Sequence, residues 1–389
     1  MLEAYAEQYR EDLTERVIPF WLDHSLDREC GGYFTCLERD GAIYDTKKYI
    51  WLQGRQVWTF SRLYNEFEAR EEYLEAAGLG LRFIRTHARD PQGRLYFSLT
   101  RDGRPYFYQR KPYAAVFYML GLLEYGRATN DRGCLAEAEE VFWRVVEWIE
   151  RPALLDRPIL AGQPAVSSLA NVMVLASMAI ELQRVRPDPR YLEVMAKAVA
   201  GARRHYDPER RLLMEHALLG EGSLAEWPEG RFFNPGHSIE VGWFLLHLLE
   251  FVDAPGCRQL ALDAIEGSLE FGWDKEYGGL FYFMDVEGKP TLQLESSMKL
   301  WWPHTEALYA VILAYDLTRE PCWLEWLERL DAYACSHFVD REYGEWFGYC
   351  DRRGELTHTC KGGSYKGCFH VPRFLLMSLQ RLEAMKPCG

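Results

Sequence analysis

The sequence predicts an all-α fold, an (α/α)6 barrel built as a toroid of six helical hairpins with short β-hairpins in its loops. Two observations predict it: a phrase that recurs about every 65 residues, and pairs of amphipathic stretches between its copies. At 389 residues, with 48% hydrophobic and 14% aromatic residues, the chain can bury the large core that such a ring requires. We therefore expect one domain that covers residues 1–389.

The recurring phrase consists of an Asp, a few polar residues, usually a Gly, and an aromatic or apolar run. It occurs five times, and its aspartates are 63, 117, 67 and 66 residues apart. The gap of 117 residues is nearly two periods, so we expect a degenerate copy near Asp156 and six units in all. The five clear copies begin at Asp27, Asp90, Asp207, Asp274 and Asp340.

The segments between the phrases have the spacing of surface helices. In 136–149 and 261–271, apolar residues recur at three- and four-residue intervals, which predicts about two helices per period. After a phrase the pattern changes briefly to alternation and ends in turns such as Glu287-Gly288 and Arg353-Gly354, which predicts short β-hairpins. An open superhelix of the same hairpins is the alternative; abundant Trp, Tyr and Phe residues favour closure around one central funnel.

Charge and composition exclude several classes of partner. The formal net charge is -13 and the basic residues are scattered, so the positive surface that nucleic acid or anionic lipid requires is missing. Residues 1–10 lack the apolar core of a signal peptide and no stretch has the length of a membrane span, so we expect a cytoplasmic protein. The ten cysteines contain no CxxC pair, and we expect reduced thiols and no metal site.

The most informative segment is 233–244, Phe-Asn-Pro-Gly-His-Ser-Ile-Glu-Val-Gly-Trp-Phe. Its Asn-Pro-Gly turn and the apolar pattern from Ile239 predict a helix that begins beside His237. Glu240 would share a helical face with His237 and could orient its imidazole. A helix N-terminus disfavours an imidazolium, which would keep His237 available as a base near neutral pH; a capping or packing role is the alternative.

A second histidine stands at a helix start in the segment 361–373. A Gly-rich stretch leads into His370, and Pro372 opens the last predicted helix. A phosphate-binding loop is the rival interpretation of so many glycines. The spacing Gly-x4-Gly-Lys-Ser/Thr that such a loop needs is missing, so we favour a histidine site.

The segment 299–308 supplies a third helix start, at which Pro303 suits the first helical position. His304 and Glu306 are two residues apart and cannot share a helical face. We predict that Glu306 points into the funnel, because Tyr309 and Ala310 continue along the same inner stripe.

A fourth segment, 49–58, combines aromatic residues with a cation. Trp51, Arg55 and Trp58 follow one another at spacings of four and three residues. Aromatic faces and a guanidinium suit a sugar, which needs a stacking surface and fixed hydrogen-bond donors. The alternative is an aromatic core seam in which Arg55 forms a structural ion pair.

These segments, together with 31–37 and 340–349, resemble the N-acylglucosamine 2-epimerase (renin-binding protein) family from about residue 17 to 380. The resemblance implies an (α/α)6 barrel that interconverts N-acetylglucosamine and N-acetylmannosamine, with ATP as an effector of some members. We also expect a homodimer. The catalytic residues that the resemblance implies are His237, His370, Glu240, Glu306 and Arg55.

The reaction accounts for these residue types. Inverting C2 of an open-chain aldose means removing a proton and returning one to the opposite face, which two facing histidines can do. Arg55 could supply positive charge to the enediolate oxygen. No hydride leaves and no dinucleotide-binding motif follows a strand, so we expect that no cofactor is required. The side chains predicted to contact the sugar are Trp51, Tyr113, Asn171, Trp302 and Lys366.

Two segments depart from the family's pattern. Residues 111–117 read Lys-Pro-Tyr-Ala-Ala-Val-Phe where many members carry Phe-Ser-Asp/Glu, and 168–171 read Ser-Leu-Ala-Asn in place of Leu-Ala-Val-Pro. The first departure is closer to the neutral-sugar epimerases, so epimerisation of mannose or cellobiose, or aldose–ketose isomerisation, is an alternative. A glycoside hydrolase that uses Glu240 and Glu306, and a sugar-binding protein without catalysis, also stay open.

Overall fold

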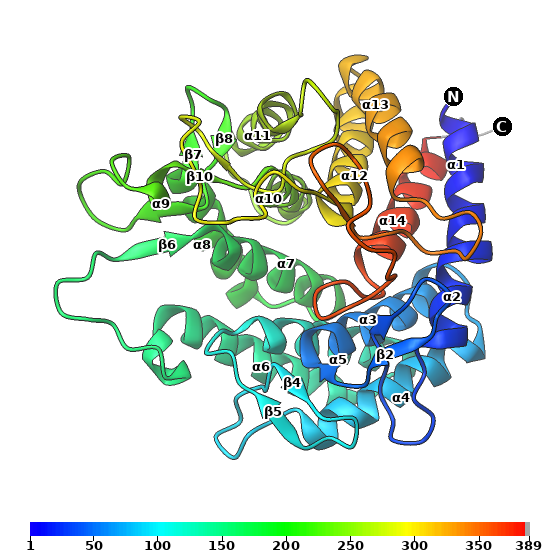
Figure 1. Ribbon diagram of the computed structural model, residues 1–389. Helices are drawn as coiled ribbons and strands as arrows, with labels where there is room; N and C mark the ends of the chain where they lie inside the picture. The colour runs from blue at the N-terminus through cyan, green and yellow to red at the C-terminus, as the bar shows by residue number, and fades with distance from the viewer. Residues whose placement is uncertain (386–389) are drawn as a thin grey trace.

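The computed structural model describes residues 1–385, and its helices form a ring of two layers (Figure 1). The inner layer consists of α3 (Ile50–Glu66), α5 (Tyr113–Thr129), α7 (Leu169–Val185), α10 (Pro235–Leu248), α12 (Trp301–Thr318) and α14 (His370–Ala384). The outer layer consists of α4 (Glu71–His87), α6 (Arg132–Glu150), α8 (Pro189–His205), α11 (Cys257–Gly272), α13 (Cys322–His337) and α1 (Leu2–Glu11).

The ring closes on itself. Each inner helix contacts the next, and α14 contacts α3, so the (α/α)6 barrel is confirmed and the open superhelix is wrong. Five pairs are hairpins of consecutive helices, but in the sixth the C-terminal α14 packs against the N-terminal α1. The N-terminal α1 and the last helix, α14, therefore lie side by side in the ring (Figure 1), and η1 (Asp12–Val17) and α2 (Ile18–His24) continue from α1.

The inner helices are buried almost all round, as their composition requires. In α10 every residue except His237 is buried, whereas outer helices such as α6 bury one face only. Close packing within the inner layer depends on small residues. A Cβ on Gly54 would lie 2.4 Å from the backbone oxygen of Phe117, so α3 and α5 can approach only because this position is glycine.

Short antiparallel strand pairs join the loops at the end of the ring where the inner helices begin. Three pairs lie within a single loop: β1 (Cys36–Leu37) with β2 (Ile43–Asp45), β4 (Ser98–Leu99) with β5 (Pro105–Phe107), and β7 (Tyr206–Asp207) with β8 (Leu212–Leu213). Of the two turns named in the sequence, Arg353-Gly354 is closed by a bridge between Cys350 and Leu356, whereas the strand before Glu287-Gly288 pairs with 232–233 and forms no hairpin with its own loop. Four others join successive repeats: β3 (Lys48–Tyr49) with β4, β6 (Val166–Ser168) with β9 (His216–Leu218), β10 (Phe232–Phe233) with β11 (Met284–Asp285), and β12 (Lys299–Leu300) with β13 (Tyr349–Cys350). These pairs form a collar that fixes the starts of the inner helices relative to one another.

The recurring aspartates fold the turns that follow the outer helices. The carboxylate of Asp27 accepts hydrogen bonds from the backbone N–H groups of Glu29 and Cys30 and binds the buried Lys48 at 2.8 Å. The same buried pairing recurs between Lys299 and Asp274 at 3.0 Å and between Lys361 and Asp340 at 2.8 Å. The degenerate copy at Asp156 follows α6 as predicted, but there the aspartate ends a short 3-10 helix, η2 (Pro152–Leu155), and pairs with Arg94.

The sequence predicts reduced cysteines and no membrane-spanning helix. Nine of the ten cysteines lie in residues 1–385 and have free thiols there, while Cys388 lies outside the described residues. Within residues 1–385, every helix is too short or too polar to cross a membrane.

Candidate active site

The predicted site residues gather at the end of the ring that carries the collar. His370 and Tyr113 are the first residues of α14 and α5, Trp302 is the second of α12, and Asn171 and His237 are the third of α7 and α10. All five are located in the first turn of an inner helix, so they border the same end of the ring axis. The partial exposure of His237, 24% in a helix whose other residues are all buried, shows that solvent reaches this end.

The indole of Trp302 lies next to both predicted catalytic histidines. Its ring centroid is 5.2 Å from the imidazole centroid of His237 and 5.9 Å from that of His370. In the ring, α12 stands between α10 and α14, so the two histidines flank Trp302 from either side. A planar group in contact with this indole can therefore lie between two imidazoles.

His237 is oriented by a carboxylate that the sequence analysis did not identify. Its Nδ1 donates to Oε1 of Glu215 at 2.8 Å, which leaves Nε2 for a substrate. The prediction that Glu240 orients this imidazole is wrong. Glu240 lies one helical turn deeper and is bound by Arg373 of α14, because its side chain extends towards the ring axis while His237 stays at the rim.

The pKa of His237 also differs from the prediction. Burial lowers it, but the charge of Glu215 and its hydrogen bond to the imidazole outweigh burial, so the pKa is raised above the ordinary value. The position at a helix N-terminus predicts a neutral ring. A carboxylate in direct contact has a stronger effect than the partial charge of a helix end, so His237 holds its proton more firmly than a free histidine.

His370 has the opposite character. Its Nδ1 donates to Oε1 of Glu306 at 2.7 Å. Burial, followed by the nearby positive charges of Arg55 and Arg373, lowers the pKa of His370 well below its ordinary value. The site therefore pairs a histidine that favours the imidazolium, His237, with one that favours the neutral base.

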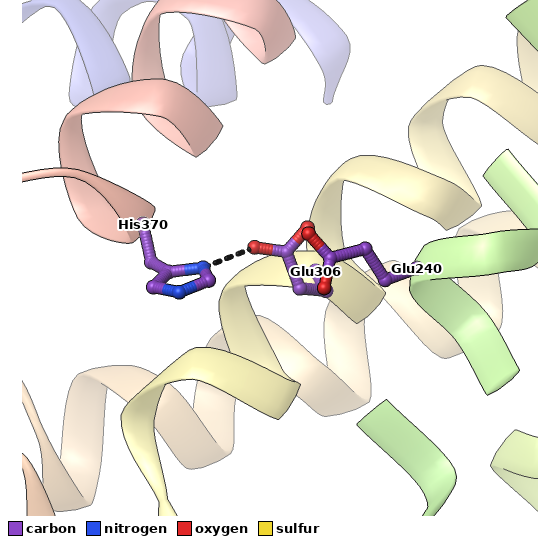
Figure 2. A group of neighbouring side chains, drawn as sticks. All are labelled: Glu240, Glu306 and His370. Atoms are coloured by element: carbon purple, nitrogen blue, oxygen red, sulfur yellow. Dashed lines mark hydrogen bonds and ion pairs between the residues drawn. The ribbon is translucent and has the colours of Figure 1, made fainter. Parts of the chain in front are cut away.

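Below the histidines lies a cluster of two carboxylates and a guanidinium. Figure 2 shows Glu240, Glu306 and His370 converging from α10, α12 and α14. Nη2 of Arg373 binds Oε1 of Glu240 at 2.6 Å and Oε1 of Glu306 at 2.7 Å, and Trp243 donates to the other oxygen of Glu306 at 3.1 Å. A cavity of about 50 Å³ on the ring axis reaches this cluster from below.

The same cluster has the spacing of a metal site. One ligand atom from each of Glu240, Glu306 and His370 lies within 4.8 Å of the other two. The guanidinium of Arg373 already binds both carboxylates and neutralises part of their charge. A divalent cation would have to displace this guanidinium, so the donor set fits an arginine better than a metal.

Arg55 is a cation that contacts aromatic rings instead of a carboxylate. Its guanidinium lies over the rings of Phe117, Trp51 and Phe369, at 3.9, 4.8 and 5.0 Å from their centroids. Its buried Nε has no hydrogen-bond partner, and within residues 1–385 its guanidinium forms no ion pair. Burial lowers the pKa of Arg55 to about 9, so the group stays charged at neutral pH.

The residues predicted to contact the sugar fall into two groups. Trp51, Tyr113, Asn171 and Trp302 are half-buried at the rim, where Tyr113 donates a long hydrogen bond of 3.5 Å to Oδ1 of Asn171. Lys366 is fully buried and does not reach the rim. Its ammonium binds Glu345 at 2.7 Å and the backbone oxygen of Lys361 at 2.8 Å, because the Gly-rich stretch folds over it.

The choice between His304 and Glu306 is settled by their contacts. Glu306 points towards the ring axis and binds His370, as predicted. His304 points away from the axis: its Nδ1 donates to the backbone oxygen of Leu300 at 2.6 Å, and its Nε2 accepts from the N–H of Leu280 at 3.0 Å. Burial lowers the pKa of His304 to about 3, so this neutral ring joins the collar to α12.

Two functional candidates were missed in the sequence. Arg373 follows His370 by three residues, a spacing that places both on one helical face and could have identified it. Glu215 lies directly before β9, eight residues after Asp207, and no local pattern links it to His237. Its role depends on the collar, in which the N–H of Glu215 donates to the backbone oxygen of Phe232 at 3.1 Å.

Known proteins resemble this chain along almost its whole length. The family model for N-acylglucosamine 2-epimerase (GlcNAc 2-epimerase) matches residues 32–371. The chain is 41% identical to N-acylglucosamine 2-epimerase of Bos taurus, covering 98% of this chain and 92% of that protein, and 32% identical to cellobiose 2-epimerase of Bacteroides fragilis, covering 97% and 99%. The structure of cellobiose 2-epimerase from Bacillus thermoamylovorans superposes with a TM-score of 0.83 at 22% identity, covering 97% and 100% of the two chains.

Proposed function

Since the chain belongs to the N-acylglucosamine 2-epimerase family, we propose that it is an isomerase that interconverts N-acetyl-D-glucosamine and N-acetyl-D-mannosamine. The observation that carries this proposal is the pair of histidines beside Trp302, one with a raised pKa and one with a lowered pKa. In such a pair His237 tends to keep its proton while His370 tends to remain a free base. That is what inversion of a carbon acid needs at the start of a turnover.

The proposed reaction removes the proton from one face of C2 and adds a proton to the opposite face. With the open-chain sugar between the imidazoles, neutral His370 removes the C2 proton, and the electron pair of the C–H bond moves to the C1 oxygen. Arg55, whose donors are free, stabilises the negative charge that develops on that oxygen. Protonated His237 then delivers its proton to the opposite face of C2. In the reverse direction the two histidines exchange roles.

Cofactor, effector and assembly are part of the same proposal. The two proton transfers balance without a hydride or group carrier, so we propose that no cofactor takes part. ATP, an effector of some family members, is proposed to act here without being consumed, and initial rates measured with and without ATP test this. We further propose a cytoplasmic homodimer, which sedimentation of the purified protein tests.

A neutral-sugar epimerase is the second candidate function. It is favoured by the segment 111–117 and by the likeness to cellobiose 2-epimerases. The hypothesis of a glycoside hydrolase is weaker. The guanidinium of Arg373 binds both Glu240 and Glu306, and Glu306 also accepts a hydrogen bond from His370. Carboxylates held in this way are poorly placed to act as the acid and the nucleophile of a glycosidase.

The first experiment is epimerisation in D2O. With N-acetylmannosamine as substrate we expect N-acetylglucosamine that carries deuterium at C2, observed by NMR as loss of the H2 signal, while unreacted substrate at early times keeps its hydrogen. Mannose and cellobiose are incubated in parallel to rank the substrates. Deuterium-free product, or absence of product from every sugar, would contradict the proposed reaction.

Glu215→Gln is expected to narrow the pH profile of kcat/KM on its alkaline side. The active enzyme form carries one proton on the histidine pair, so the alkaline limb reports loss of the His237 proton. Without the charge of Glu215, burial dominates and the pKa of His237 falls, which moves this limb to lower pH. The acidic limb, set by protonation of His370, should stay in place.

The matched control for this variant is Glu226→Gln, which removes an exposed carboxylate outside the site. Its pH profile should coincide with that of the wild type. A Glu215→Gln profile whose alkaline limb stays at the wild-type position would show that Glu215 does not hold the His237 proton.

A further inference from the structure

A second cavity lies outside the proposed catalytic site, beside β9. Its volume is about 110 Å³, more than twice that of the cavity on the ring axis. Its apolar wall consists of Pro228, Phe232 and Leu292, and its polar lining includes the side chains of His216, Glu229 and Gln293. Glu229 and Leu292 are exposed, so the cavity opens to solvent. The proposed epimerisation uses none of these residues.

Three polar groups of this cavity lack a partner within the protein. Nδ1 of His216 is buried and has no hydrogen-bond partner in the described chain, residues 1–385. The backbone oxygen of Gln293 accepts a hydrogen bond, but its side-chain amide forms none there. The carboxylate of Glu229 is likewise unpaired, because Arg231 binds Asp285 at 3.0 Å instead. A buried nitrogen without a partner costs free energy, which a ligand that supplies the missing hydrogen bond recovers.

The charge around the cavity is negative. The loops 219–231 and 285–295 together carry six carboxylates and two cations. Both cations bind carboxylates of the same loops, Arg231 at 3.0 Å from Asp285 and Lys289 at 2.7 Å from Glu287. Within residues 1–385, the other four carboxylates form no ion pair: Glu221, Glu226, Glu229 and Glu295. The cavity therefore favours a cationic ligand over an anionic one.

The arrangement of these groups favours an organic cation over a metal ion. Within residues 1–385, the imidazole and the carboxylates that line the cavity are too far apart to hold one metal ion between them. An ammonium group can instead pair with the single free carboxylate, that of Glu229. The rest of the ligand would face the apolar wall and the free groups of His216 and Gln293. A pyranose suits both, because it has an apolar C–H face and a ring of hydroxyl groups.

We propose that this cavity binds an amino sugar with a free, protonated amine. The ammonium group pairs with Glu229, and the C–H face of the sugar packs on Phe232 and Leu292. Its hydroxyl groups form hydrogen bonds with Nδ1 of His216 and the amide of Gln293. The inference goes beyond the proposed function, because it assigns a second site, and because the amide nitrogens of N-acetylglucosamine and N-acetylmannosamine carry no charge.

The cavity lies near the catalytic residues but is separate from them. Phe232 stacks on Phe283 with their ring centroids 4.8 Å apart. The ring of Tyr282 lies 4.0 Å from that of Phe283 and 6.2 Å from that of Trp302. Two aromatic side chains, those of Phe283 and Tyr282, therefore connect the wall of the cavity to the indole beside the histidines. We expect the two sites to be occupied independently.

The test is a calorimetric titration of the full chain with glucosamine at about pH 6.5, where an amine of this kind is protonated. Glucose, which has a hydroxyl group in place of the ammonium group, is titrated in parallel. We expect saturable binding of glucosamine, and binding of glucose that is weaker by about tenfold or more. Glu229→Gln removes the charged acceptor and should weaken the binding of glucosamine by about the same factor.

The matched control is Glu226→Gln, which removes an exposed carboxylate of the same loop that does not line the cavity. This variant should bind glucosamine as the wild type does. Equal weakening in both variants would assign the effect to the negative surface as a whole and would overturn the site. Equal binding of glucose and glucosamine, or absence of saturable glucosamine binding to the wild type, would overturn it as well.

A competition experiment separates this site from the catalytic one. Saturating N-acetylmannosamine should leave the affinity for glucosamine unchanged, and Glu229→Gln should keep the wild-type kcat/KM for N-acetylmannosamine. Displacement of glucosamine by N-acetylmannosamine would place the amine in the catalytic site and contradict the proposal. Because the comparison of Glu229→Gln with Glu226→Gln needs no turnover, its failure leaves the D2O experiment on the proposed function unaffected.

Discussion

His237→Asn and His370→Asn are each expected to lower kcat/KM for epimerisation by about 10²–10⁴-fold in both directions, the range that a positioned acid or base contributes. Each histidine is the base in one direction and the acid in the other, so each substitution should lower the rate in both directions. The equilibrium between the two sugars also requires both directions to fall together. The measurement is initial rates from each pure epimer.

Exchange of the C2 hydrogen separates the roles of the two histidines. A variant that keeps one base can still remove the proton on its own face and return deuterium there, without inversion. The two variants should therefore exchange opposite epimers with D2O, which NMR detects before any product forms. His358→Asn, a change at an exposed imidazole outside the pair, serves as the control. Substantial epimerisation in either variant, or exchange of the same epimer by both, would refute the two-base assignment.

The repeat could be predicted because each copy of the phrase does the same physical task. Asp27, Asp274 and Asp340 each fold a turn and bind a buried lysine, so the same residue types recur at the same spacing. The sixth pair could not be predicted in this way. α1 precedes the first phrase and carries no copy of it, and only the closed ring brings α1 to α14. The strands that join successive repeats are two or three residues long, too short to show a pattern.

The candidate site, like the fold, could be predicted from the sequence only in part. His237, Glu306 and His370 could be found because Asn-Pro-Gly, Pro303 and a Gly-rich stretch mark helix starts, and helix starts meet at one end of the ring. Which carboxylate serves which histidine could not be found, because spacing along one helix reports only neighbours on that helix. Spacing along the helix predicts Glu240 as the partner of His237, whereas the partner in the structure, Glu215, comes from the loop that precedes the helix.

Lys366 was predicted to contact the sugar, but in the structure it has a buried structural role. Its place between glycines and His370 favoured a role in sugar binding, but its charge is needed to neutralise Glu345, which also accepts from the buried Trp21 at 2.6 Å. A lysine near a catalytic residue in sequence can serve the packing of the loop instead. Burial decides between the two roles, and burial of a loop residue depends on what folds over it.

Arg373→Met is expected to lower the free energy of unfolding by about 3–5 kcal/mol, the usual cost of leaving a buried charge without its partner. Two carboxylates lose their counter-charge at once, because Arg373 binds both Glu240 and Glu306 in a region where all three side chains are at most 8% exposed. Urea unfolding measures the effect as a shift of the midpoint at an unchanged slope. Arg373→Lys keeps the charge but cannot reach both carboxylates as the planar guanidinium does, so it should fall between the wild type and Arg373→Met.

The triple variant Arg373→Met/Glu240→Gln/Glu306→Gln identifies why Arg373→Met loses stability. Replacing both carboxylates by amides removes the unpaired charges, so most of the stability lost in Arg373→Met should return. Epimerase activity should not return, because His370 also loses the charged partner at its Nδ1. If the triple variant is as unstable as Arg373→Met, the loss arises instead from the packing of the guanidinium on Phe369 and Trp243, whose ring centroids lie 4.6 and 5.1 Å away.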